Sequence, residues 1–211
     1  MFVINTSGWK LSPFRYDSYG PYVMDIYLNG APNNIPTADM LNLIDEARRS
    51  WNRIPRNRVQ IEIGKVIPPG IPCKEVSEST TIYTREGSES RFGVICFEHT
   101  DAGAAQTRYT NSPHSTSQQQ MFRGASVFLN TKLQLNKETT YNILLHELGH
   151  VNLLKHPDEN WVFLKHKEYE LPIMLMKLDF ISNRNRYKHH DQYYELAIDD
   201  VAAVMYRNPV W

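Results

Sequence analysis

The stretch HELGHVNLLKH, residues 146–156, gathers side chains that are suited to metal chemistry. It contains His146, Glu147, His150 and His156. Residues four positions apart on an α-helix project from the same side, about 6 Å apart along the axis, so His146 and His150 can reach one metal ion. Imidazole nitrogens suit zinc, and a catalytic zinc takes three protein ligands and keeps a position for water. The spacing therefore predicts a zinc site that includes both histidines.

Glu147 directly follows the first of these histidines, where its carboxylate can reach a water molecule at the metal. A carboxylate in that place can take the proton of the water and later pass it to a leaving amine. Zinc lowers the pKa of the water toward neutrality and polarises a substrate carbonyl. These groups together meet the needs of amide hydrolysis, so we expect Glu147 to be the general base of a hydrolase.

His156 is either the third ligand or a bystander, depending on where the helix ends. In an unbroken helix it would lie about 15 Å along the axis from His146 and face roughly 80° away. Pro157 indicates that the chain has left the helix by this point. We therefore predict a helix end near Asn152 or Leu153, with unusual backbone there. A left-handed Leu153 would cost on the order of 1–2 kcal/mol, which metal binding can offset.

The elements that must position these residues are predicted from apolar periodicity. Strands are predicted over 20–30, 58–66, 80–84, 91–99 and 125–130, and an exposed edge segment over 101–110. Helices are predicted over 36–54, 137–154 and 195–208, with a loop over 111–124. This order predicts an α/β or α+β domain, with a mixed sheet covered by helices on one side. Thr37 is the candidate cap of the first helix, and Thr139 or Thr140 that of the second.

The helices also predict which residues enter the core. Apolar residues fall on one face of the first helix at Met40, Leu43, Ile44, Ala47 and Trp51. The last helix offers apolar anchors at Leu196, Val201, Val204 and Met205.

Composition limits the classes of function. The 211-residue chain has 23 basic and 23 acidic residues, so its formal net charge is zero. It therefore lacks the excess of positive charge typical of proteins that bind nucleic acid or an anionic membrane. Its apolar runs are too short to span a membrane. The first residues lack a signal-peptide pattern, so we expect either a protein retained in the cell or a mature chain. Cys73 and Cys96 are compatible with a disulfide or with two free thiols.

The pattern HExxH followed by His156 resembles the metzincin zinc endopeptidases, whose pattern is HExxHxxGxxH with a methionine turn downstream. The chain is most similar to the matrixin-type catalytic domain, loosely from Trp9 to Tyr206, through its segments 47–54, 59–63, 124–131 and 197–206. One departure is Leu153, which replaces the glycine of the pattern. The resemblance implies that His146, His150 and His156 bind one catalytic zinc ion and that Glu147 is the base.

The resemblance also implies a fold. It is a single catalytic domain over residues 1–211, with a twisted mixed sheet of about five strands and the active-site helix in an upper lobe, 1–152. A smaller lower lobe, 153–211, would hold the methionine turn and a final helix. Met174, in LPIMLM, is the expected turn methionine, and Met176 stands where some relatives have a tyrosine ligand, so no such ligand is expected.

Substrate and setting follow from the same resemblance. An extended peptide or protein substrate would lie antiparallel to an edge strand that contains Ala104, Ala105, Gln106 and Thr107. The family favours a secreted or extracellular location. We assume a monomer, and the balanced charge and short apolar runs predict no nucleic-acid or membrane partner. Structural calcium is compatible with the family, but we assign no residue to it.

Two alternatives stay open. In a gluzincin-type hydrolase, Glu168 or Glu170 would supply the third ligand instead of His156. In the other alternative the chain binds zinc without turnover, or docks a partner as a toxin-like effector.

Overall fold

The computed structural model describes residues 15–17, 22–73, 92–98, 103–117, 120–133 and 135–156, together with Met174, Leu196, 200–201 and 204–205. This part contains the helices α1 (Thr37–Asn52) and α2 (Lys137–Val151). Its strands are β1 (Arg15–Tyr16), β2 (Tyr22–Tyr27), β3 (Ile61–Ile67), β4 (Gly93–Glu98), β5 (Ala105–Asn111) and β6 (Met121–Asn130). The predicted strand 80–84 and most of the predicted lower lobe lie outside the described residues.

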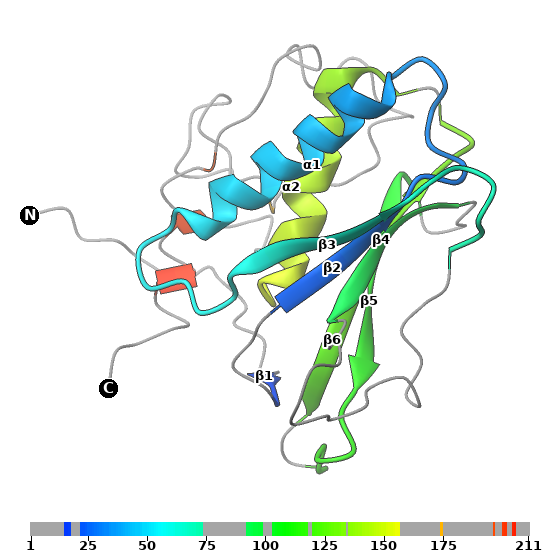
Figure 1. Ribbon diagram of the computed structural model, residues 1–211. Helices are drawn as coiled ribbons and strands as arrows, with labels where there is room; N and C mark the ends of the chain where they lie inside the picture. The colour runs from blue at the N-terminus through cyan, green and yellow to red at the C-terminus, as the bar shows by residue number, and fades with distance from the viewer. Residues whose placement is uncertain are drawn as a thin grey trace, which may run out of the picture.

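The strands form one mixed sheet in the order β1-β6-β4-β2-β3 (Figure 1). Strands β1 and β4 pair with one side of β6, and β5 pairs with its opposite side. The pairs along this order are parallel, and β5 runs antiparallel to β6. Both helices lie on the same face of the sheet (Figure 1). The predicted mixed α/β arrangement is therefore confirmed, with six strands in the described part rather than about five because β1 adds a two-residue ladder.

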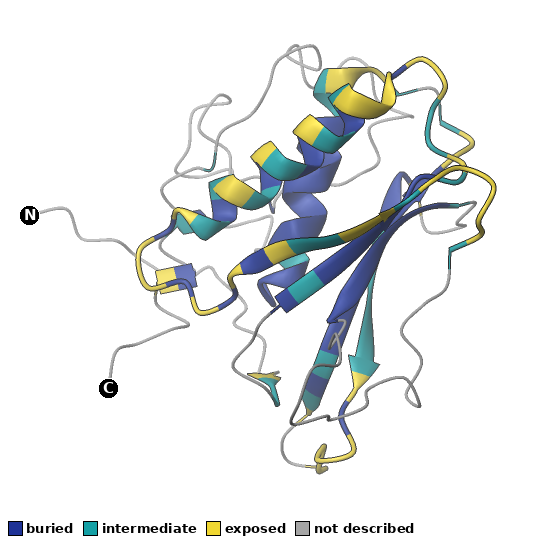
Figure 2. Ribbon diagram, in the orientation of Figure 1, coloured by how far each residue is buried: buried dark blue, intermediate teal, exposed yellow. Residues whose placement is uncertain are grey.

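Helix α1 buries the stripe predicted from its periodicity, Met40, Leu43, Ile44, Ala47 and Trp51. These side chains pack with α2 and the inner face of the sheet in one apolar core. Figure 2 shows the buried residues in dark blue along α2, on parts of α1 and along the strands. Both predicted helix caps were wrong. Helix α1 starts after Pro36 without a side-chain cap, and the Asn136 side chain caps α2 by accepting from the Thr139 amide.

Strand β6 is longer than predicted, because its first four residues were assigned to a loop. Residues 121–124, MFRG, pair with β1 on one side and β5 on the other, so neighbouring strands hold a segment that directly follows a polar stretch rich in Ser and Gln. Strand identity here depends on tertiary pairing more than on local propensity.

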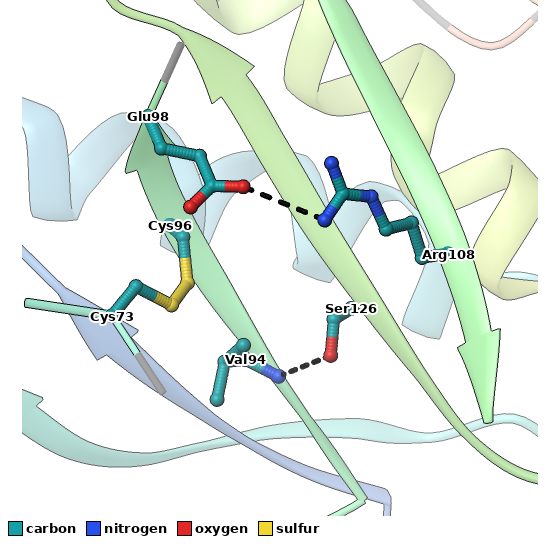
Figure 3. The surroundings of a disulfide bond; sticks show 6 residues. All are labelled: Cys73, Val94, Cys96, Glu98, Arg108 and Ser126. Atoms are coloured by element: carbon teal, nitrogen blue, oxygen red, sulfur yellow. Dashed lines mark hydrogen bonds and ion pairs between the residues drawn. A yellow bond between two sulfur atoms is a disulfide. The ribbon is translucent and has the colours of Figure 1, made fainter. Parts of the chain in front are cut away.

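Cys73 and Cys96 form a disulfide, which decides between the two states that the sequence left open (Figure 3). Cys96 lies in β4, in a second buried cluster with Tyr27, Val94 and Phe128. The Arg108 guanidinium covers the Phe128 ring at 4.2 Å from its centroid. The disulfide thus attaches the segment after β3 to the middle of the sheet, on the face opposite the helices.

The last predicted helix is described only in part. Residues 200–201 and 204–205 are helical. Val204 is buried and Leu196 and Val201 pack against the core, whereas Met205, also expected as an anchor, is exposed. Neither described helix has the length and apolar character that crossing a membrane requires.

Candidate metal centre

Three histidines converge at the carboxyl end of α2. The Nε2 atoms of His146 and His156 are 3.0 Å apart, and one ligand nitrogen from each of His146, His150 and His156 lies within 4.8 Å of the others. Nitrogens that bind one ion at about 2.0–2.1 Å in tetrahedral geometry stand about 3.3 Å apart, so the set fits a single metal ion with small adjustments. His146 is buried, His150 is half-buried and His156 is exposed, which leaves a side open to solvent.

The turn that brings His156 back begins where it was predicted. Helix α2 ends at Val151, and Leu153 has a left-handed backbone with φ of 61°. The amide of Leu153 donates to the carbonyl of His150 at 2.6 Å, and that of Leu154 donates to Gly149 at 3.1 Å. These two bonds define a Schellman motif, which usually has glycine at the left-handed position.

Burial explains how leucine serves at this position. The Leu153 side chain is 4% exposed. Full burial of a leucine contributes about 1.5–3 kcal/mol, which is at least comparable to the roughly 1–2 kcal/mol that left-handed backbone costs a residue with a Cβ.

A pair of buried amides holds the same turn from the side of α1. The Asn152 side chain donates to the carbonyl of Leu148 at 2.8 Å. Its Oδ1 accepts from Nδ2 of Asn57 at 2.9 Å, and Asn57 also donates to the carbonyl of Trp51 at 3.0 Å. The loop after α1 is thereby fixed to the end of α2.

Two carbonyls at the end of α2 also accept from aromatic side chains of the sheet. The Tyr109 hydroxyl donates to His150 at 2.7 Å, and the Tyr16 hydroxyl donates to Val151 at 2.8 Å. Helix termini leave such carbonyls without helical partners, and buried ones need replacements. Strands β1 and β5 therefore fix the helix end from which His146 and His150, two candidate metal ligands, project.

His150 is oriented for metal binding through its second ring nitrogen. Its Nδ1 lies 2.8 Å from the carbonyl of Leu154, which can only accept, so Nδ1 carries the proton and Nε2 is left for a metal. Burial lowers the pKa of His150 to about 4, against the weaker opposite effect of this hydrogen bond. The imidazole is therefore neutral near pH 7, the form that binds metals.

Glu147 is buried beside this group, and its carboxyl bonds to the sheet. The Thr107 hydroxyl lies 2.6 Å from its Oε2 and 3.1 Å from its backbone carbonyl. Burial raises the pKa of Glu147 to about 7, and the hydrogen bonds from Thr107 oppose that rise only in part. A carboxyl that titrates near neutrality is suited to accepting and returning a proton.

The residues assigned to a substrate edge take the following places. Strand β5 begins at Ala105, so Ala104 lies just before it, with its carbonyl accepting from Asn130 at 2.9 Å. Ala104 and Ala105 are buried, and Gln106 and Thr107 are half-buried, so the expected exposure of this segment was wrong. Strand β5 borders β6 on one side, and no described strand pairs with its other side.

Met174 is fully buried and lies against α2 at Gly149. A Cβ built on Gly149 would collide with its sulfur and lie 2.9 Å from the Trp51 ring, so glycine leaves the space that this methionine occupies. The residues on either side of Met174 lie outside the described part, as do Met176, Glu168 and Glu170, so the methionine turn stays a prediction.

Sequence reasoning did not predict the contacts of Thr107, Tyr109 and Asn57 with this centre. They join residues 40, 41 and 95 positions apart, and local pattern carries no indication of such distant partners. Alternation along β5, which puts Thr107 and Tyr109 on one face, was the available indication.

No protein-family model and no curated protein matches the chain. The residues above therefore provide the basis for assigning a function.

Proposed function

We propose that this protein is a zinc-dependent endopeptidase with a metzincin-like, matrixin-type catalytic domain. The observation that carries the proposal is the left-handed turn at Leu153, because it folds His156 back to within 3.0 Å of His146. A histidine ten residues further along a continuous helix could not reach that place. Chain geometry, rather than the histidine spacing alone, thus supports a three-histidine ligand set.

In this proposal His146, His150 and His156 hold the zinc ion through ring nitrogens. Zinc supplies Lewis acidity, which lowers the pKa of water and polarises the scissile carbonyl. Glu147 takes a proton from the attacking water and delivers it to the leaving amine nitrogen. Burial of the carboxyl raises its pKa to about 7, which suits both transfers.

The substrate would be an extended peptide that pairs antiparallel with β5. Strand addition to a sheet edge gives affinity through backbone hydrogen bonds, whatever the side chains. The supporting observation is that β5 is the outer strand on its side of the described sheet and contacts α2 through Thr107 and Tyr109. A peptide on β5 would therefore pass close to the metal centre.

The ligand set is tested by measuring zinc affinity in His156→Ala, Glu168→Gln and Glu170→Gln. Losing a first ligand should weaken zinc binding by more than the roughly 10–100-fold typical of second-sphere changes. The proposal predicts this loss in His156→Ala alone. Unchanged affinity in His156→Ala, with a loss in one of the glutamate variants, would instead support the gluzincin alternative.

The reaction is tested by incubating the zinc-loaded protein with a peptide library and identifying the products by mass spectrometry. Cleavage at internal bonds by wild type, and none by Glu147→Ala at equal zinc content, is the expected result. Stoichiometric zinc without cleavage by either protein would support the non-catalytic alternative.

A further inference from the structure

Thr107 makes a contact that an edge-strand residue does not need for sheet formation. Its hydroxyl lies 2.6 Å from Oε2 of Glu147 and 3.1 Å from the Glu147 backbone carbonyl. The Thr107 hydroxyl therefore contacts both the side-chain carboxyl and the backbone carbonyl of Glu147. Because the contact is formed in a half-buried place, it is less screened than a surface hydrogen bond.

The contact belongs to a larger attachment between β5 and α2. Residues two apart in a strand share a face, and the next residue on this face, Tyr109, donates to the carbonyl of His150. One face of β5 thus holds the carboxyl of Glu147 and the backbone of a metal-binding residue. On the opposite face, Arg108 pairs with Glu98 at 3.5 Å (Figure 3). Its guanidinium also covers the Phe128 ring. Both faces of β5 are therefore anchored.

A hydrogen bond to one carboxyl oxygen restricts how the other can move. With Oε2 held by Thr107, rotation about the side-chain torsions of Glu147 is limited. A group held in the reactive orientation reacts faster than one that must find it, and small misplacements reduce rates strongly.

We propose that Thr107 is a positioning residue that holds the Glu147 carboxyl in its reactive orientation and couples that orientation to the strand that binds the substrate. This inference rests on the proposed peptidase function. Pairing with a substrate strand would need only the backbone of Thr107. The inference adds a role for its side-chain hydroxyl.

Thr107→Val removes the hydroxyl and keeps the shape and strand propensity of the side chain. We expect its kcat to fall about 10–100-fold, with KM within about twofold, because ground-state binding through the β5 backbone is retained. Thr107→Ser should recover most of the lost kcat. Thr140→Val is the matched control, since the buried Thr140 hydroxyl bonds to Asn136 at 2.8 Å at the opposite end of α2. It should lower thermal stability and leave kcat unchanged.

A second measurement needs no turnover. In the metal-free protein, the side-chain ¹³C carboxyl signal of Glu147 is assigned by its loss in Glu147→Gln. It should shift in Thr107→Val, return in Thr107→Ser and stay in place in Thr140→Val. An unshifted signal, or an unchanged kcat in Thr107→Val of an active enzyme, would overturn the role of Thr107. Absence of cleavage by wild type would instead refute the peptidase function, with the carboxyl signal still reporting on the contact.

Discussion

The turn that brings His156 toward the candidate metal centre requires a left-handed backbone at Leu153. Its φ of 61° and its burial act in opposite directions on stability. We predict that Leu153→Ala and Leu153→Gly both destabilise the fold by about 2–5 kcal/mol, because both lose the buried side chain. The free energy of unfolding of Leu153→Gly should nevertheless exceed that of Leu153→Ala by about 1 kcal/mol, since only glycine takes this conformation without a penalty.

Urea unfolding of the two variants measures this difference. At an ordinary right-handed position the order is reversed, because glycine loses more chain entropy than alanine on folding. If alanine were the more stable substitution, Leu153 would not have the left-handed backbone on which the placement of His156 depends.

At the scale of elements, the end of α2 is fixed by the loop that follows α1. Asn57 and Asn152 bond to each other at 2.9 Å inside the protein, and removing either leaves a buried amide group without its partner. We expect Asn57→Ala and Asn152→Ala each to cost about 1–3 kcal/mol. The double variant should cost less than their sum by about 0.5–3 kcal/mol.

The control for this cycle is Asn34→Ala, which removes an exposed amide bond to the carbonyl of Leu135 at 2.8 Å. Its cost should stay near 0.5 kcal/mol and add to that of Asn57→Ala without coupling. Full additivity between Asn57 and Asn152 would mean that the two amides do not act as a unit.

The elements also show why sequence predicts some features and not others. The apolar stripe of α1 was predictable because a period of 3.6 residues expresses burial directly in the sequence. The helix starts were predicted to within one residue, but the capping residues were not, because several polar residues near each start can serve as a cap: α1 follows Pro36 without a side-chain cap, and α2 is capped by Asn136. The first residues of β6 directly follow the polar run STSQQQ, so they were assigned to the same loop, whereas in the fold they pair with β1 and β5.

At the scale of the whole molecule, the disulfide connects the segment after β3 to the central strand β4. Its cysteines are 23 residues apart in sequence. Closing a loop of this size in the unfolded chain stabilises a protein by about 3 kcal/mol. We expect Cys73→Ala/Cys96→Ala to lose about this much in urea unfolding, and wild type with reductant to lose a similar amount.

Thiol labelling under denaturing conditions provides the direct check. Without reductant no label should be taken up, and after reduction both cysteines should react. Labelling of both cysteines in the untreated protein would show that they are free thiols, and the stability difference should then disappear.

The candidate site combines residues that sequence identified with residues that only the fold brings there. His146, Glu147 and His150 were predictable because one helix carries them at a fixed spacing. His156 required a turn whose position could be predicted from helical geometry, although the expected glycine is absent. Thr107, Tyr109 and Asn57 depend on packing between elements, which no local pattern encodes.

The central claim is that a glutamate beside a three-histidine metal centre catalyses peptide-bond hydrolysis. Its most direct test is the rate at which zinc-loaded Glu147→Gln cleaves a peptide that the wild type cleaves. The variant should bind zinc as the wild type does, and its kcat should be lower by about 10²–10⁴-fold, the usual contribution of a general base. Equal rates of cleavage by the two proteins at equal zinc content would contradict the account.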